Sequence, residues 1–83
     1  MIPEPLVRSL LAGLIVLEGA DDSEIDPEVA VAGMESMAHE LQDLAPGEIV
    51  ELIAVIERIA DAEGDAGRHA FCRAVPRTLG LEV

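Results

Sequence analysis

The longest apolar run in the chain covers residues 6–17, LVRSLLAGLIVL, in which Arg8 is the only charged residue. In helical register, residues of this run recur every three or four positions on one face: Leu6, Val7, Leu10, Leu14 and Leu17. Leu11, Ile15 and Val16 then fall on the sides and back. A helix that is apolar nearly all round is buried on more than one side. We therefore expect residues 6–17 to form either the central helix of the domain or a contact with a second chain.

A second helix is indicated by a start signal at residues 26–28, after a polar and acidic connection at residues 20–25. Asp26 is a favoured N-cap residue, Pro27 suits the first helical position, and Glu28 places a carboxylate near the positive end of the helix dipole. Apolar residues then recur on one face: Ala30, Met34, Met37, Leu41 and Leu44. The pattern predicts an amphipathic helix over residues 26–44.

A third helix is predicted after the break at residues 45–48, with Pro46 in its first turn and its end in the acidic turn at residues 61–65. Its apolar face comprises Ile49, Leu52, Ile53, Ile56, Ile59 and Ala60. Val50 and Val55 fall outside this face, so we expect them on the surface or in an interface.

A fourth helix is expected over residues 66–75. Its inward face comprises Phe71, Ala74, Val75 and, in part, Cys72. Pro76 lacks the backbone N–H that a continuing helix needs, so we expect it to end this helix. Residues 77–79 would then form one further turn, and residues 80–81 would fold back over the core.

These segments and their short connections predict the all-α class, as a compact four-helix bundle with a short C-terminal helical turn. No segment alternates with period two for long enough to indicate a strand, and we expect residues 1–83 to form a single domain. Phe71 is the only aromatic residue, and the single Cys72 excludes an intramolecular disulfide. A small aliphatic core without such a staple often gains stability by oligomerising, so a homodimer through residues 6–17 is one alternative.

The charge of the chain is strongly biased: 17 acidic residues and 5 arginines give a formal net charge of −12. Residues 1–65 hold 16 of the acids but only Arg8 and Arg58. Such a surface repels phosphates, which disfavours nucleic-acid binding, whereas it attracts and steers a basic protein partner. The same charge also keeps a small apolar domain soluble, and the sequence leaves both interpretations open.

The apolar run does not have the features of a membrane or secretory segment. A membrane-spanning helix takes about 20 residues, and Glu4, Arg8 and Glu18 flank or interrupt this shorter run. A signal peptide needs a basic leader and a small-residue cleavage site. We therefore expect a cytoplasmic protein without a membrane partner. The use of arginine without lysine, together with abundant alanine, is associated with GC-rich bacterial genomes.

The candidate partner-binding residues are carboxylates of the acidic connection and of the outer faces of the second and third helices. They are Asp21, Asp22, Glu24, Glu35, Asp43, Glu51, Glu57 and Asp61. Arg58 and Asp61, three residues apart, are expected to form an ion pair. The sequence assigns no catalytic residue, metal ligand or cofactor, and we expect a protein that is not an enzyme.

Two further patterns contain residue types that occur at metal or thiol sites. Glu35, His39 and Asp43 stand one turn apart and could hold a divalent metal, but they lie on a solvated face. His69 and Cys72 are also one turn apart, between arginines that favour a thiolate, yet no third orienting group accompanies them. A free cysteine is most often a small buried hydrophobic residue. Neither pattern by itself predicts a site.

Residues 33–37, GMESM, resemble the G-x-D-S-L sequence at which acyl and peptidyl carrier proteins carry their prosthetic arm. Their length, acidity and four-helix form are also similar, and the resemblance implies a modified serine at Ser36. Glu35 and Met37 depart from the pattern. The context also differs, because in carrier proteins the serine begins a helix, whereas Ser36 lies inside the helix predicted over residues 26–44.

These observations predict a small acidic module that acts by binding another protein. In length and charge the chain is similar to the small acidic four-helix immunity proteins of nuclease bacteriocins, which implies a bacterial inhibitor of a basic toxin. None of their motifs is present, so no residues are carried over from them. A carrier-type protein modified at Ser36 and a structural homo-oligomeric subunit are the alternatives.

Overall fold

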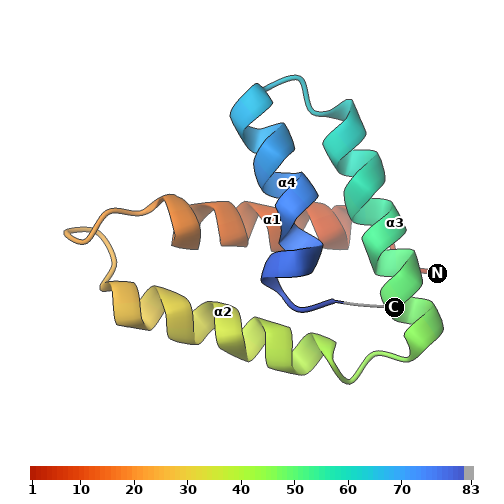
Figure 1. Cartoon of the computed structure of the whole chain (residues 1–83), viewed down its shortest axis with the longest axis horizontal. Helices are drawn as coiled ribbons and strands as arrows, with labels where there is room; N and C mark the ends of the chain where they lie inside the picture. The colour runs from red at the N-terminus through yellow and green to blue at the C-terminus, as the bar shows by residue number, and fades with distance from the viewer. Residues whose placement is uncertain (82–83) are drawn as a thin grey trace.

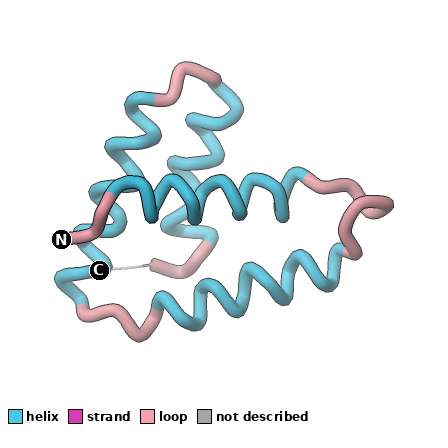
Figure 2. Tube along the Cα trace, turned by 180° about the vertical axis from the view of Figure 1, so that it is seen from behind, coloured by secondary structure: helices cyan, strands magenta, loops and turns pink. Residues whose placement is uncertain are grey.

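Four α-helices make up the part of the chain that the computed structural model describes, residues 1–81. They are α1 (Glu4–Gly19), α2 (Pro27–Leu41), α3 (Pro46–Ala62) and α4 (Ala66–Thr78), and no strand occurs among these residues. α1 and α2 run side by side in opposite directions, and α3 and α4 form a hairpin that crosses α1 (Figure 1). From behind, α1 lies across this hairpin and α2 follows one edge of the molecule (Figure 2). The predicted all-α four-helix fold is confirmed.

The helix starts follow from local sequence. The Asp26 carboxylate caps α2 by accepting a hydrogen bond from the backbone N–H of Glu28 at 2.8 Å, as predicted. Asp65 caps α4 in the same way, through the N–H of Arg68 at 2.9 Å. At the start of α3, Glu48 accepts from the N–H of Ala45 at 2.8 Å. Each bond satisfies a backbone donor at or next to a helix start, where helical partners are lacking.

α2 ends at Leu41, earlier than the predicted end at Leu44. The N–H of Asp43 bonds to the carbonyl of Glu40 at 3.1 Å, and the N–H of Leu44 bonds to that of Leu41 at 3.2 Å. These i to i+3 bonds tighten the chain into a turn and satisfy the last carbonyls of α2. Leu44 still packs against the core from this turn, as the apolar pattern predicted.

The buried face of α1 differs from the predicted one. Val7, Leu11 and Leu14 are buried, whereas Leu6 is 65% exposed and Val16 is 60% exposed. Leu11 therefore replaces Leu6 on the inner face, because α1 is buried chiefly where it crosses the α3–α4 hairpin. Leu10 and Leu17 are half-buried; the side chain of Leu17 approaches Gly33 of α2. α1 is the central helix of the fold, but its outer side is uncovered among the described residues.

The core lies where α1, α3 and α4 meet, and α2 contributes only Ala30 to the fully buried set. The predicted face of α3 is confirmed for its buried members, which are Leu52, Ile56, Ile59 and Ala60. Val55 is also buried, although the pattern placed it outside, because α3 packs against both α1 and α4. In α4, Cys72 and Val75 are buried and Phe71 is half-buried, whereas Ala74 is exposed, contrary to expectation.

Pro76 lies inside α4 rather than ending it. The residues after it are helical, as predicted, but they continue α4 to Thr78 instead of forming a separate turn. Pro76 has no N–H to donate to the carbonyl of Cys72, one turn earlier. Beyond Pro76, the N–H of Leu79 donates to the Val75 carbonyl at 2.9 Å and the N–H of Leu81 donates to the Pro76 carbonyl at 2.8 Å. Gly80 reverses the chain with φ 68°, which returns Leu81 to the core, as predicted.

None of the helices in the described part of the chain is long and apolar enough to cross a membrane.

Candidate functional site

Residues 18–48, the acidic segment, are rich in carboxylates and contain no lysine or arginine. In Figure 1 it runs from the end of α1 (orange) along α2 to the start of α3 (green), following one edge of the molecule. His39 is its only side chain that can become positive. Its ten carboxylates, all exposed, belong to Glu18, Asp21, Asp22, Glu24, Asp26, Glu28, Glu35, Glu40, Asp43 and Glu48.

Among residues 1–81, every ion pair lies outside the acidic segment. Glu4 pairs with Arg8 at 3.5 Å and with Arg58 at 3.6 Å. The N-terminal ammonium lies 3.7 Å from Glu51, which also accepts a hydrogen bond from the N–H of Ile2. The cations of these ion pairs therefore bind carboxylates outside the acidic segment.

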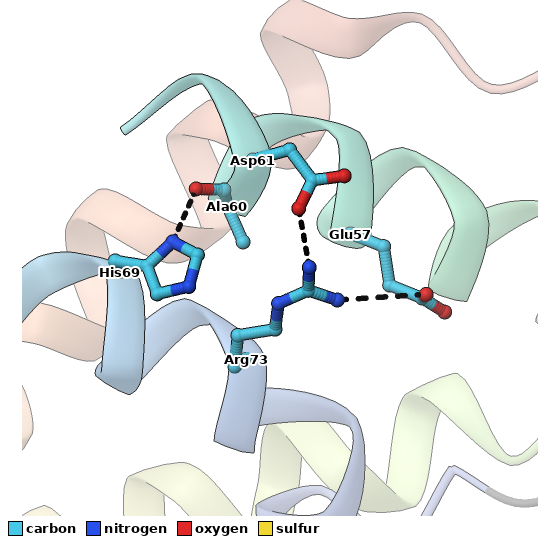
Figure 3. A network of polar contacts seen from close by, with 5 residues as sticks. All are labelled: Glu57, Ala60, Asp61, His69 and Arg73. Carbon is cyan, nitrogen blue, oxygen red and sulfur yellow. Dashed lines mark hydrogen bonds and ion pairs between the residues drawn. The ribbon is translucent and has the colours of Figure 1, made fainter. Parts of the chain in front are cut away.

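Arg73 of α4 holds two of the predicted partner-binding residues. Its guanidinium pairs with Glu57 at 3.7 Å and with Asp61, both on α3 (Figure 3). The predicted pair between Arg58 and Asp61 is wrong, because Arg58 pairs with Glu4 and Asp61 pairs with Arg73 across the helix hairpin. These contacts join α3 to α4 and leave Glu57 and Asp61 partly neutralised.

The α1–α2 loop is ordered by its own carboxylates. Asp21 Oδ1 accepts hydrogen bonds from the Ser23 hydroxyl at 2.6 Å, the Ser23 N–H at 2.9 Å and the Glu24 N–H at 3.1 Å. The Ser23 hydroxyl, followed by these backbone donors, lowers the pKa of Asp21 below its ordinary value. Asp21 is therefore negative throughout the neutral range, and the loop presents a fixed charge.

Six carboxylates of the acidic segment make no side-chain hydrogen bond or ion pair among residues 1–81. They are Glu18, Asp22, Glu28, Glu35, Glu40 and Asp43. Like charges held on one edge of a small domain repel one another and raise the free energy of the folded state. A partner that brings cations to this edge relieves the repulsion, and the negative potential accelerates its association at low salt.

The structure divides the eight predicted partner-binding residues into two groups. Five lie in the acidic segment, which are Asp21, Asp22, Glu24, Glu35 and Asp43. The other three, Glu51, Glu57 and Asp61, lie on α3 beside cations of the chain itself. The sequence prediction omitted Glu18, Asp26, Glu28, Glu40 and Glu48. The signal that identifies them is the absence of any lysine or arginine between Arg8 and Arg58.

In the described part of the chain, the two alternative patterns do not form an arrangement suited to metal or thiol chemistry. Within residues 1–81, no three His, Cys, Asp or Glu side chains come together to hold a metal ion, so Glu35, His39 and Asp43 form no such cluster. Cys72 is 4% exposed, and burial, with a smaller contribution from the negative charge of Glu63, raises the pKa of its thiol. This position is typical of a core cysteine rather than of a nucleophile.

His69 has a structural contact. Its ring nitrogen Nδ1 donates a hydrogen bond to the carbonyl of Ala60 at 2.7 Å (Figure 3). Ala60 lies in the last turn of α3, and its carbonyl also accepts a hydrogen bond from the backbone N–H of Glu63 at 3.1 Å. His69 thus joins α4 to the C-terminal end of α3, and it is not arranged as a base beside an exposed thiol.

Ser36 is exposed on α2, well inside a helix that begins at Pro27. The predicted difference from the carrier-protein context is therefore confirmed, since Ser36 does not begin a helix.

Neither the sequence nor the fold has a significant match: no protein-family model, no curated protein and no solved structure is similar to this chain. The acidic segment itself is thus the basis for inferring a function.

Proposed function

We propose that this chain is a small, non-enzymatic interaction module that binds a basic protein through the acidic segment. The observation that supports the proposal is the run of ten exposed carboxylates on residues 18–48 without one lysine or arginine. A structural role explains only some of them, because six have no hydrogen-bonding or ionic partner among residues 1–81. Carboxylates left in this arrangement offer complementary charge to a basic cleft.

The most concrete form of the proposal is a bacterial inhibitor or immunity protein that covers the basic active site of a toxin. The carboxylates of the α1–α2 loop and α2 would take the place of an anionic substrate. Association would be fast at low ionic strength and would weaken with salt, because exposed charges are screened over about 8 Å at physiological ionic strength. The proposed location is the cytoplasm, where a lone thiol such as Cys72 stays reduced.

The test is affinity capture from the native lysate at low salt, followed by elution with a salt gradient. Two baits carry the same change in net charge: Asp22→Asn with Glu35→Gln in the acidic segment, and Glu51→Gln with Glu57→Gln on α3. We expect a basic protein that elutes at lower salt from the first variant than from the wild type. The α3 variant should resemble the wild type, because its two carboxylates already have cationic neighbours.

Two results would contradict the proposal. The first is the capture of no basic protein at low salt. The second is a basic protein that elutes at the same salt from all three baits, since its binding would then not involve the acidic segment. Mass spectrometry of the native protein separately tests the carrier alternative, because a prosthetic arm on Ser36 would add mass to the chain.

A further inference from the structure

The side of α1 that faces away from the α3–α4 hairpin is uncovered among the described residues. Figure 2 shows this side in front, with none of the other described helices over it. With about 3.6 residues per turn, the exposed residues on this side lie opposite the buried residues of the helix. They form the outer face of α1, which comprises Pro5, Ser9, Ala12, Gly13 and Val16.

The outer face of α1 carries no charged side chain, although the chain has a formal net charge of −12. Each of the other three helices exposes charged side chains, such as Glu35 on α2, Arg58 on α3 and Arg73 on α4. On the outer face Val16 is 60% exposed, and Leu6 at its edge is 65% exposed. Both side chains forgo most of the free energy that burial would supply. Exposed apolar side chains without charges are typical of the centre of an interface.

The accessible surface of the molecule is larger than that of a compact monomer. A monomer of 8.8 kDa is expected to expose about 4,800 Å², whereas this chain exposes 5408 Å². The excess is about 600 Å², and each partner in a specific interface contributes about 600–1,000 Å². The molecule is also only 19 Å thick along its shortest axis, because α1 and the hairpin form two layers without a third. The excess thus has the size of one copy's share of a small dimer interface.

We propose that two copies of this chain associate through the outer faces of their α1 helices, which cross in antiparallel directions about a two-fold axis. Such a contact brings the same surface of both copies together, and a face without charge can meet itself without burying or opposing any charge. A basic partner finds no complementary carboxylate on this face. Association of a second copy covers side chains that the monomer leaves in water, so this inference is independent of the proposed function.

The direction of the two helices follows from the charges at the end of α1. The α1–α2 loop comes directly after this end and exposes the carboxylates of Asp21, Asp22 and Glu24. In a parallel contact the two loops would lie at the same end of the interface and repel each other. An antiparallel contact places one loop at each end, about 24 Å apart for a helix of 16 residues. It also sets the two helix dipoles in opposite directions.

Sedimentation velocity of the full chain, over a range of protein concentrations at low and at high salt, measures the self-association. We expect a dimer whose dissociation constant falls as salt is added, because salt screens the repulsion between two strongly negative chains. Binding of a basic protein through the acidic segment has the opposite salt dependence. The sign of the salt effect therefore separates the two contacts.

Two matched variants place the interface. Val16→Glu and Val29→Glu add the same charge at positions that are 60% and 62% exposed, and circular dichroism checks that both remain folded. Val16→Glu should weaken dimerisation at least about tenfold, because it buries an unpaired carboxylate in the contact. Val29→Glu, on α2, should change the dissociation constant by no more than about twofold, since its added charge lies outside the contact.

Mild oxidation of single-cysteine additions tests the direction of the helices. Ala12→Cys, near the middle of α1, should form an intermolecular disulfide faster than Gly19→Cys at its C-terminal end. The native Cys72 is buried and serves as the background in the unmodified chain. Faster linking through Gly19→Cys would overturn the antiparallel contact, because the C-terminal ends of the two helices would then lie together.

Three other results would overturn the proposal. They are a monomer at every concentration and salt, a dimer that Val16→Glu and Val29→Glu weaken equally, and a dimer that dissociates as salt is added. The last would be held by charge rather than by an apolar face. None of these results bears on the proposed function, because the affinity capture can be repeated with Val16→Glu as the bait.

Discussion

The exchange of Leu6 and Leu11 between the surface and the core of α1 can be tested by shortening each side chain. The apolar pattern placed Leu6 on the inner face and Leu11 to the side. In the structure, the side chain of Leu11 is only 3% exposed, whereas that of Leu6 is 65% exposed. Leu11→Ala removes buried methyl groups and leaves a cavity, which costs about 2–5 kcal/mol in a core. Leu6→Ala removes atoms that are mostly hydrated and should cost no more than about 0.5 kcal/mol.

The expected difference is large for a domain of this size. At roughly 0.05–0.15 kcal/mol per residue, a chain of 83 residues has a total stability of about 4–12 kcal/mol. A loss of about 3 kcal/mol therefore removes a quarter or more of it and lowers Tm by about 12–24 °C. Leu6→Ala should shift Tm by no more than about 4 °C on the same scale.

Urea and thermal unfolding followed by helical circular dichroism measure both variants, because the chain has no tryptophan or tyrosine to report by fluorescence. The packing argument for α1 would be refuted if Leu6→Ala cost as much as Leu11→Ala at low protein concentration. A cost of Leu6→Ala that grows with protein concentration would show instead that α1 contacts a second chain. Equal unfolding slopes in urea are required for the comparison to be valid.

Three further predictions concern single contacts. His69→Ala should destabilise the fold by about 1 kcal/mol through loss of the bond to the Ala60 carbonyl, whereas His39→Ala, at an exposed site on α2, should change urea stability little. Equal effects of the two variants would contradict a stabilising role for this bond. Gly80→Ala should lower the free energy of unfolding by about 1 kcal/mol, because a residue with a side chain is strained at φ 68°. Gly13→Ala should raise the free energy of unfolding by about 0.5–1 kcal/mol, because the added methyl group meets no atom within 4 Å. Shifts of Tm in the same direction for both variants would contradict this prediction. Burial raises the pKa of the Cys72 thiol. The buried neutral thiol therefore contributes stability at pH values below the ordinary cysteine pKa, and this contribution is lost as the pH rises above that value. Alkylation of Cys72 at neutral pH should be slower in the folded chain than in urea, and equal rates would refute the burial of Cys72.

Among the surface residues, the charge pattern could be anticipated but the pairing of charges could not. The sequence has no lysine or arginine between Arg8 and Arg58, and this pattern alone is enough to identify the acidic segment. The pairing of Asp61 with Arg73 depends on two helices meeting. Neighbours three residues apart, such as Arg58 and Asp61, are suggested by sequence spacing, but a partner on another helix replaced that local choice.

The sequence by itself determined the number of helices and most of their starts, because caps and prolines act within one turn of the chain. Asp26-Pro27 and Pro46 open α2 and α3 wherever those helices finally pack. The tertiary structure decided which side of α1 is buried, why Val55 is in the core, and what His69 contacts. A helix that is apolar nearly all round satisfies the helical period on several faces, so only the position of the α3–α4 hairpin across it could select Leu11 over Leu6. That selection left Leu6 at the surface.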